Sequence, residues 1–179
     1  MRIFILAALF CINICFGQSK YLTRSGTVSF EASMPAFEEV KANNETVTAI
    51  FNSANGEMAI LALVKGFRFK NALMEEHFNE NYLESSKFPK AIFKGKIEQF
   101  KSQTGIQNAT LSGTLQMHGV TNAVSTFATL NLTDNQLIFN GFVKVNASEY
   151  GVEIPKIVRN KVSDVVTIQF DFILTKKSD

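Results

Sequence analysis

Residues 124–132 read VSTFATLNL, and every second residue from Val124 to Leu132 falls on one mostly apolar face. Successive side chains of a β-strand point to opposite sides of the sheet, so a period of two predicts a strand with one face turned inward. The same period recurs in residues 137–145 (LIFNGFVKV) and 165–174 (VVTIQFDFIL). These three stretches predict an all-β fold.

Similar runs occur through the rest of the chain. The predicted strands are residues 28–32, 46–53, 57–64, 91–100, 110–117, 124–132, 137–145 and 165–174. Asn55-Gly56, between the second and third of them, is a strong hairpin signal. Strands at this spacing favour a sandwich or a barrel, and eight strands close into a barrel with room for side chains or one ligand. We therefore expect an extended eight-stranded antiparallel β-barrel of the lipocalin-like kind.

One segment departs from this pattern. In residues 71–85, Met74, Phe78 and Tyr82 recur every four positions, and glutamates fill much of the remainder. This spacing predicts one amphipathic helix of about four turns, inserted mid-chain and packed over an end or a side of the barrel.

The first 17 residues are typical of a secretory signal peptide. Arg2 precedes an apolar run from Ile3 to Phe16, too short for a membrane anchor. We expect residues 1–17 to be cleaved, leaving one domain, residues 18–179, without a stable membrane anchor. Because Cys11 and Cys15 both lie in the removed segment, the exported chain would contain no thiol.

Composition excludes several classes of function. The formal net charge of +2, from 18 basic and 16 acidic side chains, gives no electrostatic footprint for nucleic acid or for an anionic membrane. The chain has no G-x-G phosphate loop and no G-x-S-x-G nucleophile elbow. Its 17 phenylalanines, with no tryptophan, indicate a dry core or the lining of a dry cavity.

Two histidines are the candidates for chemistry. His77 has Glu76 and Glu80 nearby, but this spacing is not a zinc-hydrolase motif, and a metal site would need a further ligand from elsewhere. His118, at the end of a strand and before Gly119, fits a structural role in which it bonds backbone groups at a turn. We expect no catalytic residue, no metal and no cofactor.

Three segments together resemble the YceI-like family. They are residues 74–95 (MEEHFNENYLESSKFPKAIFKG), 113–121 (GTLQMHGVT) and 146–152 (NASEYGV). The second is similar to the family signature G-x-L-x-x-H-G-V-T, in which His118, Gly119, Val120 and Thr121 would be structural. The resemblance implies a lipocalin-like barrel with a long apolar cavity that binds polyisoprenoids or similar amphiphiles in the bacterial periplasm. No head-group residues are carried over from the family.

The leading interpretation is an exported, non-catalytic binding protein for a polyisoprenoid-like lipid, periplasmic or secreted. The candidate cavity residues are Phe67, Phe69, Leu73, Phe78, Phe93, Leu115, Met117, Phe127, Phe139 and Phe142. Alternation identifies the faces of a strand but not which face is the lumen. Two alternatives stay open: a metal-assisted hydrolase that uses His77, and an interaction module whose barrel is filled by its own side chains. The sequence leaves a homodimer open as well.

Overall fold

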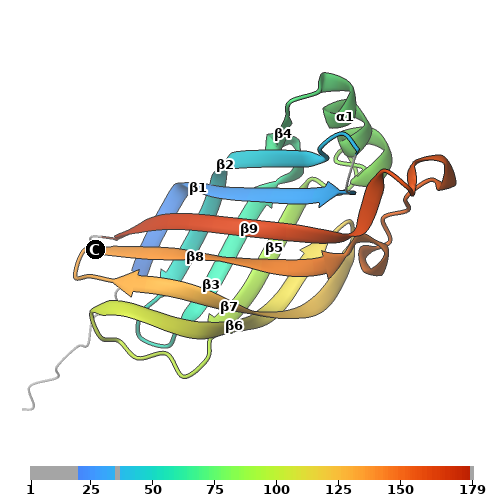
Figure 1. Ribbon diagram of the computed structural model, residues 1–179. Coiled ribbons are helices and arrows are strands. Elements are labelled where there is room, and N and C mark those ends of the chain that lie inside the picture. Colours follow the sequence, from blue (N-terminus) through green and yellow to red (C-terminus); the bar gives the residue numbers. More distant parts are fainter. Residues whose placement is uncertain (1–19, 35–36, 178–179) are drawn as a thin grey trace, which may run out of the picture.

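The computed structural model describes residues 20–34 and 37–177 (Figure 1). The predicted signal peptide, residues 1–17, and the cleavage point before Gln18 lie outside these ranges. The strands are β1 (Lys20–Ser33), β2 (Lys41–Asn52), β3 (Glu57–Leu63), β4 (Arg68–Phe69), β5 (Lys90–Ile97), β6 (Gly105–Met117), β7 (Val120–Leu132), β8 (Gln136–Asn146) and β9 (Val162–Lys176). Most are longer than predicted, because pairing continues beyond the apolar runs that mark them in the sequence.

The strands form one antiparallel sheet in the order β1-β9-β8-β7-β6-β5-β3-β2-β4, and a further pairing of β1 with β2 closes it. Eight strands thus make a closed barrel, and the two-residue β4 extends the sheet beside β2. The Asn55-Gly56 hairpin is present, with Asn52 opposite Glu57 in the β2–β3 ladder. The prediction of an eight-stranded antiparallel barrel is confirmed.

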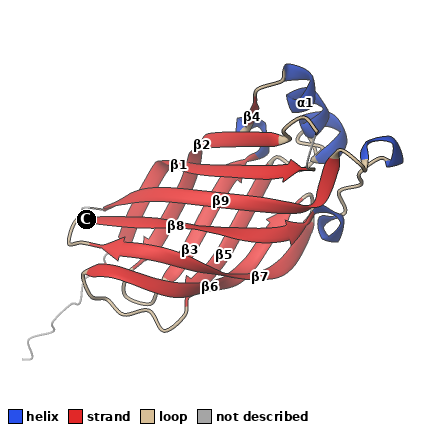
Figure 2. Cartoon of the chain, viewed as in Figure 1, coloured by secondary structure: helices blue, strands red, loops and turns tan. Residues whose placement is uncertain are grey.

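The helical segments gather at one end of the barrel (Figure 2). They are α1 (Ala72–His77), the π-helical turn η2 (Phe78–Tyr82), and the 3₁₀ turns η1 (Val64–Gly66), η3 (Ala147–Tyr150) and η4 (Lys156–Val158). Asn71 caps α1, because its side chain accepts hydrogen bonds from the backbone N–H groups of Leu73 and Met74. The predicted helix is present but ends at Tyr82, not Ser85. Within the described ranges, no helix is long and apolar enough to span a membrane.

The opposite end of the barrel is filled. The side chains of Phe51, Leu130, Leu137, Phe139, Phe172 and Leu174 are fully buried there. Packing is close: a Cβ added at Gly26 on β1 would lie 2.2 Å from a ring carbon of Phe172. This end therefore supplies a solid apolar core that can stabilise the barrel without help from a ligand.

Strands β7 and β8 are joined by a ladder over only part of their length. Their ladder covers only Ala128–Leu132 and Leu137–Gly141, although β7 stays paired with β6 back to Val120 and β8 with β9 as far as Asn146. We call the unpaired stretch, residues 120–127 and 142–146, the β7–β8 seam. Side chains bridge it: Thr126 donates to the carbonyl of Phe142, and Asn122 donates to that of Glu149 (2.9 Å).

Candidate ligand cavity

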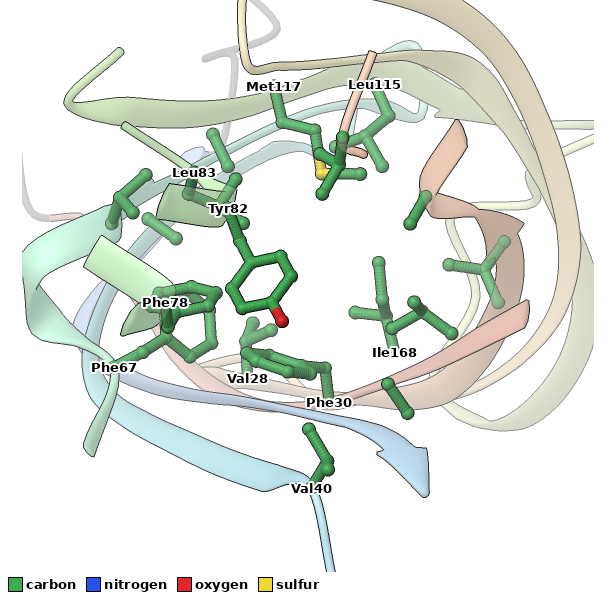
Figure 3. A pocket seen from close by; sticks show the side chains of 18 of the residues that line it. Val28, Phe30, Val40, Phe67, Phe78, Tyr82, Leu83, Leu115, Met117 and Ile168 are labelled. Atoms are coloured by element: carbon green, nitrogen blue, oxygen red, sulfur yellow. The ribbon is translucent and has the colours of Figure 1, made fainter. Parts of the chain in front are cut away.

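A cavity of about 380 Å³ occupies the helical end of the barrel. Its wall takes side chains from β1, β3, β5, β6, β7, β8 and β9 and from the helical segment, and these are overwhelmingly apolar. The central ones include Val28, Phe30, Phe67, Phe78, Leu83, Leu115, Met117 and Ile168 (Figure 3). This volume falls within the range of small-molecule pockets.

One wall of the cavity is aromatic. The Phe78 ring lies 5.3 Å from that of Phe30, 5.9 Å from that of Phe67 and 5.1 Å from that of Phe69, measured between centroids. Phe78 lies on η2 and Phe30 lies on β1. This cluster therefore packs the helical segment against the barrel. Stacked and edge-to-face arrangements at these distances are the ones that aromatic pairs prefer, so the cluster stabilises this wall.

The other wall is aliphatic, with Leu115 and Met117 from β6 and Ile168 from β9 (Figure 3). The Tyr82 ring projects between the two walls and carries its hydroxyl into the cavity (Figure 3). The floor is formed by Phe170 and Phe172, whose rings are stacked at 6.0 Å. Phe139 stacks beneath Phe170 at 5.2 Å, so the cavity floor is continuous with the filled end.

The exposed members of the lining mark where the cavity meets solvent. Glu38, His77 and Lys161 lie at its mouth, together with the half-buried Ser163. Ser125, also exposed, lies on β7 at the seam. Polar groups thus lie at the openings, whereas the interior is lined by apolar side chains, the Met117 thioether among them, and by the Tyr82 hydroxyl.

Six of the ten candidate residues lie on the cavity wall: Phe67, Phe69, Phe78, Phe93, Leu115 and Met117. Three others point outward instead, with exposures of 57% for Leu73, 82% for Phe127 and 54% for Phe142. Leu73 lies in the first turn of α1, on its solvent side. Phe127 and Phe142 have the outward parity on their strands, opposite to Ala128 and Phe139.

Phe139 has the inward parity but the wrong position along the barrel. It is completely buried in the filled end, below the cavity floor, and packs against Phe170 rather than lining the cavity. Sequence reasoning also missed Phe30, Tyr82 and Ile168. Alternation could have found Phe30 and Ile168, because each shares a face with residues already assigned to one side of its strand.

His118 does not face the cavity but ties three segments together. His118 and Gly119 both have positive φ, 51° and 79°, and form the two-residue turn between β6 and β7. The ring donates from Nδ1 to the carbonyl of Tyr150 (3.0 Å), and its Nε2 lies 2.9 Å from Oε2 of Glu84. Val120 and Thr121 then open β7, opposite Met117 and Gln116.

His77 is exposed at the mouth. Within residues 20–34 and 37–177, no three or more His, Cys, Asp or Glu side chains come together in a group that could hold a metal ion.

The YceI-like domain model matches residues 21–174, which is nearly the whole described barrel. The chain belongs to the YceI-like family. Curated proteins gave no match to this YceI-like chain.

Solved structures share the YceI-like fold. A polyisoprenoid-binding domain from Saccharophagus degradans is 14% identical, with a TM-score of 0.77 over 90% of this chain and 100% of that one. Burkholderia cenocepacia BcnA is 17% identical, with a TM-score of 0.68 over 83% of this chain and 95% of that one. The YCEI protein of Campylobacter jejuni is 16% identical, with a TM-score of 0.66 over 81% and 90%. At these identities the likeness shows the fold alone.

Proposed function

We propose that this YceI-like protein is exported and holds the tail of a polyisoprenoid-like lipid in its barrel cavity, without catalysing a reaction. The observation that carries the proposal is an apolar cavity with a closed floor: Phe170 and Phe172 block one end, and the mouth at Lys161 is open. An apolar cavity that is open at one end and closed at the other can bury a long hydrocarbon tail, but it offers few partners to a compact polar substrate. The relative from Saccharophagus degradans is itself described as polyisoprenoid-binding.

Energetics favour a long tail. Each CH₂ group removed from water contributes about 0.8 kcal/mol, so a few isoprene units supply a useful affinity. Part of this gain is lost when a flexible tail is ordered. The polar head would stay at the mouth, where Glu38, His77, Lys161 and Ser163 lie and where solvent can hydrate it.

The two alternatives are less well supported. The hydrolase would need further metal ligands beside His77, and no such group occurs among the described residues. The filled-barrel module fits the end around Phe139, but not the helical end, which is hollow.

The test is a titration of delipidated protein with isoprenoids of graded length. Affinity should rise with each unit until the tail reaches the floor at Phe170 and then level off, whereas a change of head group should matter less. Equally weak binding at every length would contradict the proposal.

Two isoleucines of β9 provide a matched pair of variants. Ile168 lines the cavity, whereas Ile173 is 53% exposed on the outer face of the same strand. Ile168→Asp should abolish binding, since an unpaired charge in a dry cavity is very costly, and Ile173→Asp should leave it unchanged. If Ile168→Asp does not fold, Ala91→Phe supplies an apolar substitute, because it fills the cavity and should shorten the longest tail that binds.

Export is tested separately. Intact-mass analysis of protein from the exported fraction of its host should show a chain that begins at or near Gln18 and has no thiol. A retained N-terminus, or a lipid adduct at Cys11 or Cys15, would refute this part of the proposal.

A further inference from the structure

The segment 153–163, which includes η4, forms one side of the cavity mouth. It projects beyond the end of the barrel as the outermost coil at the right of the view (Figure 2). At its tip Ile157 is 86% exposed, the most exposed large apolar side chain among the described residues. An isoleucine presented to solvent in this way contributes nothing to the core, so it is available to contact something outside the molecule.

The surroundings of Ile157 are basic. Lys156, Arg159 and Lys161 are all exposed, whereas the segment contains one acid, Glu153. Among the described residues, none of these three cations lies within salt-bridge distance of a carboxylate, and the printed partner of Arg159 is the carbonyl of Ile154 (3.1 Å). These cations are therefore a local unpaired cluster, although the net charge of the whole chain is only +2.

The helical side of the mouth carries both signs of charge. Glu38 is exposed there, and the nearby cations Arg68 and Lys70 are paired with Glu75 (2.8 Å) and Glu39 (3.0 Å). Because the unpaired cations lie on one side of the mouth only, an anionic surface would contact the segment 153–163 and not α1.

The same segment reaches into the cavity. Val158, Lys161 and Val162 belong to the cavity lining, so a surface held against Ile157 lies next to the opening. A projecting apolar residue among cations is the combination that binds the interface of an anionic bilayer, because the apolar group enters the head-group region and the cations attract lipid phosphates.

We propose that the segment 153–163 docks the barrel on the surface of an anionic lipid bilayer, with Ile157 inserted and Lys156 and Arg159 at the phosphates. The mouth then opens against the membrane, and a lipid tail passes between bilayer and cavity without crossing water. This exchange rests on the proposed cavity function, whereas docking itself does not.

Binding to vesicles tests the docking. The exported protein is mixed with vesicles of phosphatidylglycerol and phosphatidylcholine, or of phosphatidylcholine alone, at about 0.1 M salt. We expect binding to the anionic vesicles that weakens with added salt. Lys156→Gln combined with Arg159→Gln should lower the partition coefficient roughly 25-fold, at about five-fold for each charge. Lys94→Gln with Lys96→Gln, two exposed cations on β5, is the matched control and should change it little.

A second pair of variants tests whether Ile157 itself enters the bilayer. Ile157→Asp removes the proposed inserting side chain, and its control Ile173→Asp removes an exposed isoleucine elsewhere on the surface. Ile157→Asp should reduce vesicle binding about ten-fold or more, whereas Ile173→Asp should not. Isoprenoid affinity in solution should be unchanged in Ile157→Asp, since this side chain does not line the cavity. Absence of binding to anionic vesicles, or equal losses in the test and control variants, would overturn the docking. Intact vesicle binding with no isoprenoid affinity would overturn the proposed function alone.

Discussion

One imidazole, that of His118, joins the β6–β7 turn to the segments that carry Glu84 and Tyr150. Its ring also packs edge-on against Phe88, with 4.7 Å between centroids. The sequence suggested a structural histidine at a turn, but Glu84 lies 34 positions away and Tyr150 lies 32. Contacts this remote along the chain carry no periodic signal, so the partners could not be predicted.

His118→Ala should lower the free energy of unfolding by about 1–3 kcal/mol, because the buried carbonyl of Tyr150 loses its donor. Urea denaturation measures the change through its midpoint. His77→Ala, at an exposed position, is the control and should stay within about 0.5 kcal/mol of the parent. Equal losses in the two variants would contradict the role assigned to His118.

Tyr21 provides a test at alkaline pH. Burial raises the pKa of its phenol above the ordinary value of 10.0, and nearby Asp134 raises it further. The hydroxyl donates to the carbonyl of Thr133 (3.1 Å). Since the phenol releases its proton more readily in the unfolded chain, its contribution to stability is complete below pH 10 and is lost as the pH rises through the folded pKa.

Tyr21→Phe should therefore show a shallower decline in stability above pH 10 than the parent does. Urea midpoints from pH 8 to pH 11 measure the slope. Superimposable alkaline profiles would show that Tyr21 ionises equally in both states.

The strands follow the alternation rule closely. Ala128 and Phe139 lie on the mostly apolar faces of β7 and β8, and both are buried. Phe127 and Phe142, predicted as cavity residues, lie on the opposite faces and are exposed, because alternation separates the two faces of a strand without saying which one is the lumen. Exposing a phenylalanine on the outer face costs free energy. A strand can bring that side chain inward only by a one-residue shift in register, which would move every other side chain to the opposite face as well.

Two phenylalanines of β8 test this directly. Phe139→Ala should cost about 3–5 kcal/mol of stability, since it leaves a cavity in the filled end. Phe142→Ala should change stability by less than about 0.5 kcal/mol. Chemical denaturation of both variants is the measurement, and comparable losses would mean that the two faces of β8 are wrongly assigned.

The helical segment shows why boundaries are harder to predict than elements. Met74, Phe78 and Tyr82 have the spacing of a helix, and the segment from Ala72 to Tyr82 is helical. Beyond it Glu84 has a φ of 42° and reaches His118, so the end is fixed by a distant partner rather than by a local signal.

The barrel as a whole is solid at one end and hollow at the other. Composition could not reveal this division, because phenylalanine serves equally as core and as lining. Phe172, at the boundary, does both: it packs in the filled end and forms part of the cavity floor.

A bound ligand should stabilise the whole barrel. At a free concentration 100 times its Kd it adds about 2.7 kcal/mol, which raises the Tm of a chain of this size by about 5–10 °C. The shift should grow with isoprenoid length and disappear in Ile168→Asp. Thermal unfolding followed by circular dichroism measures it, and a Tm independent of tail length would oppose a ligand inside the barrel.

The β7–β8 seam is a stretch where two neighbouring strands of the barrel are not joined by a ladder. Where a ladder is present, its hydrogen bonds hold neighbouring strands about 4.8 Å apart. Across the seam, Thr126 and Asn122 provide side-chain bonds in place of a ladder. Widening the barrel near Val124 and Val143 would therefore require the breaking of side-chain bonds alone, whereas widening it around Phe139 would break a ladder.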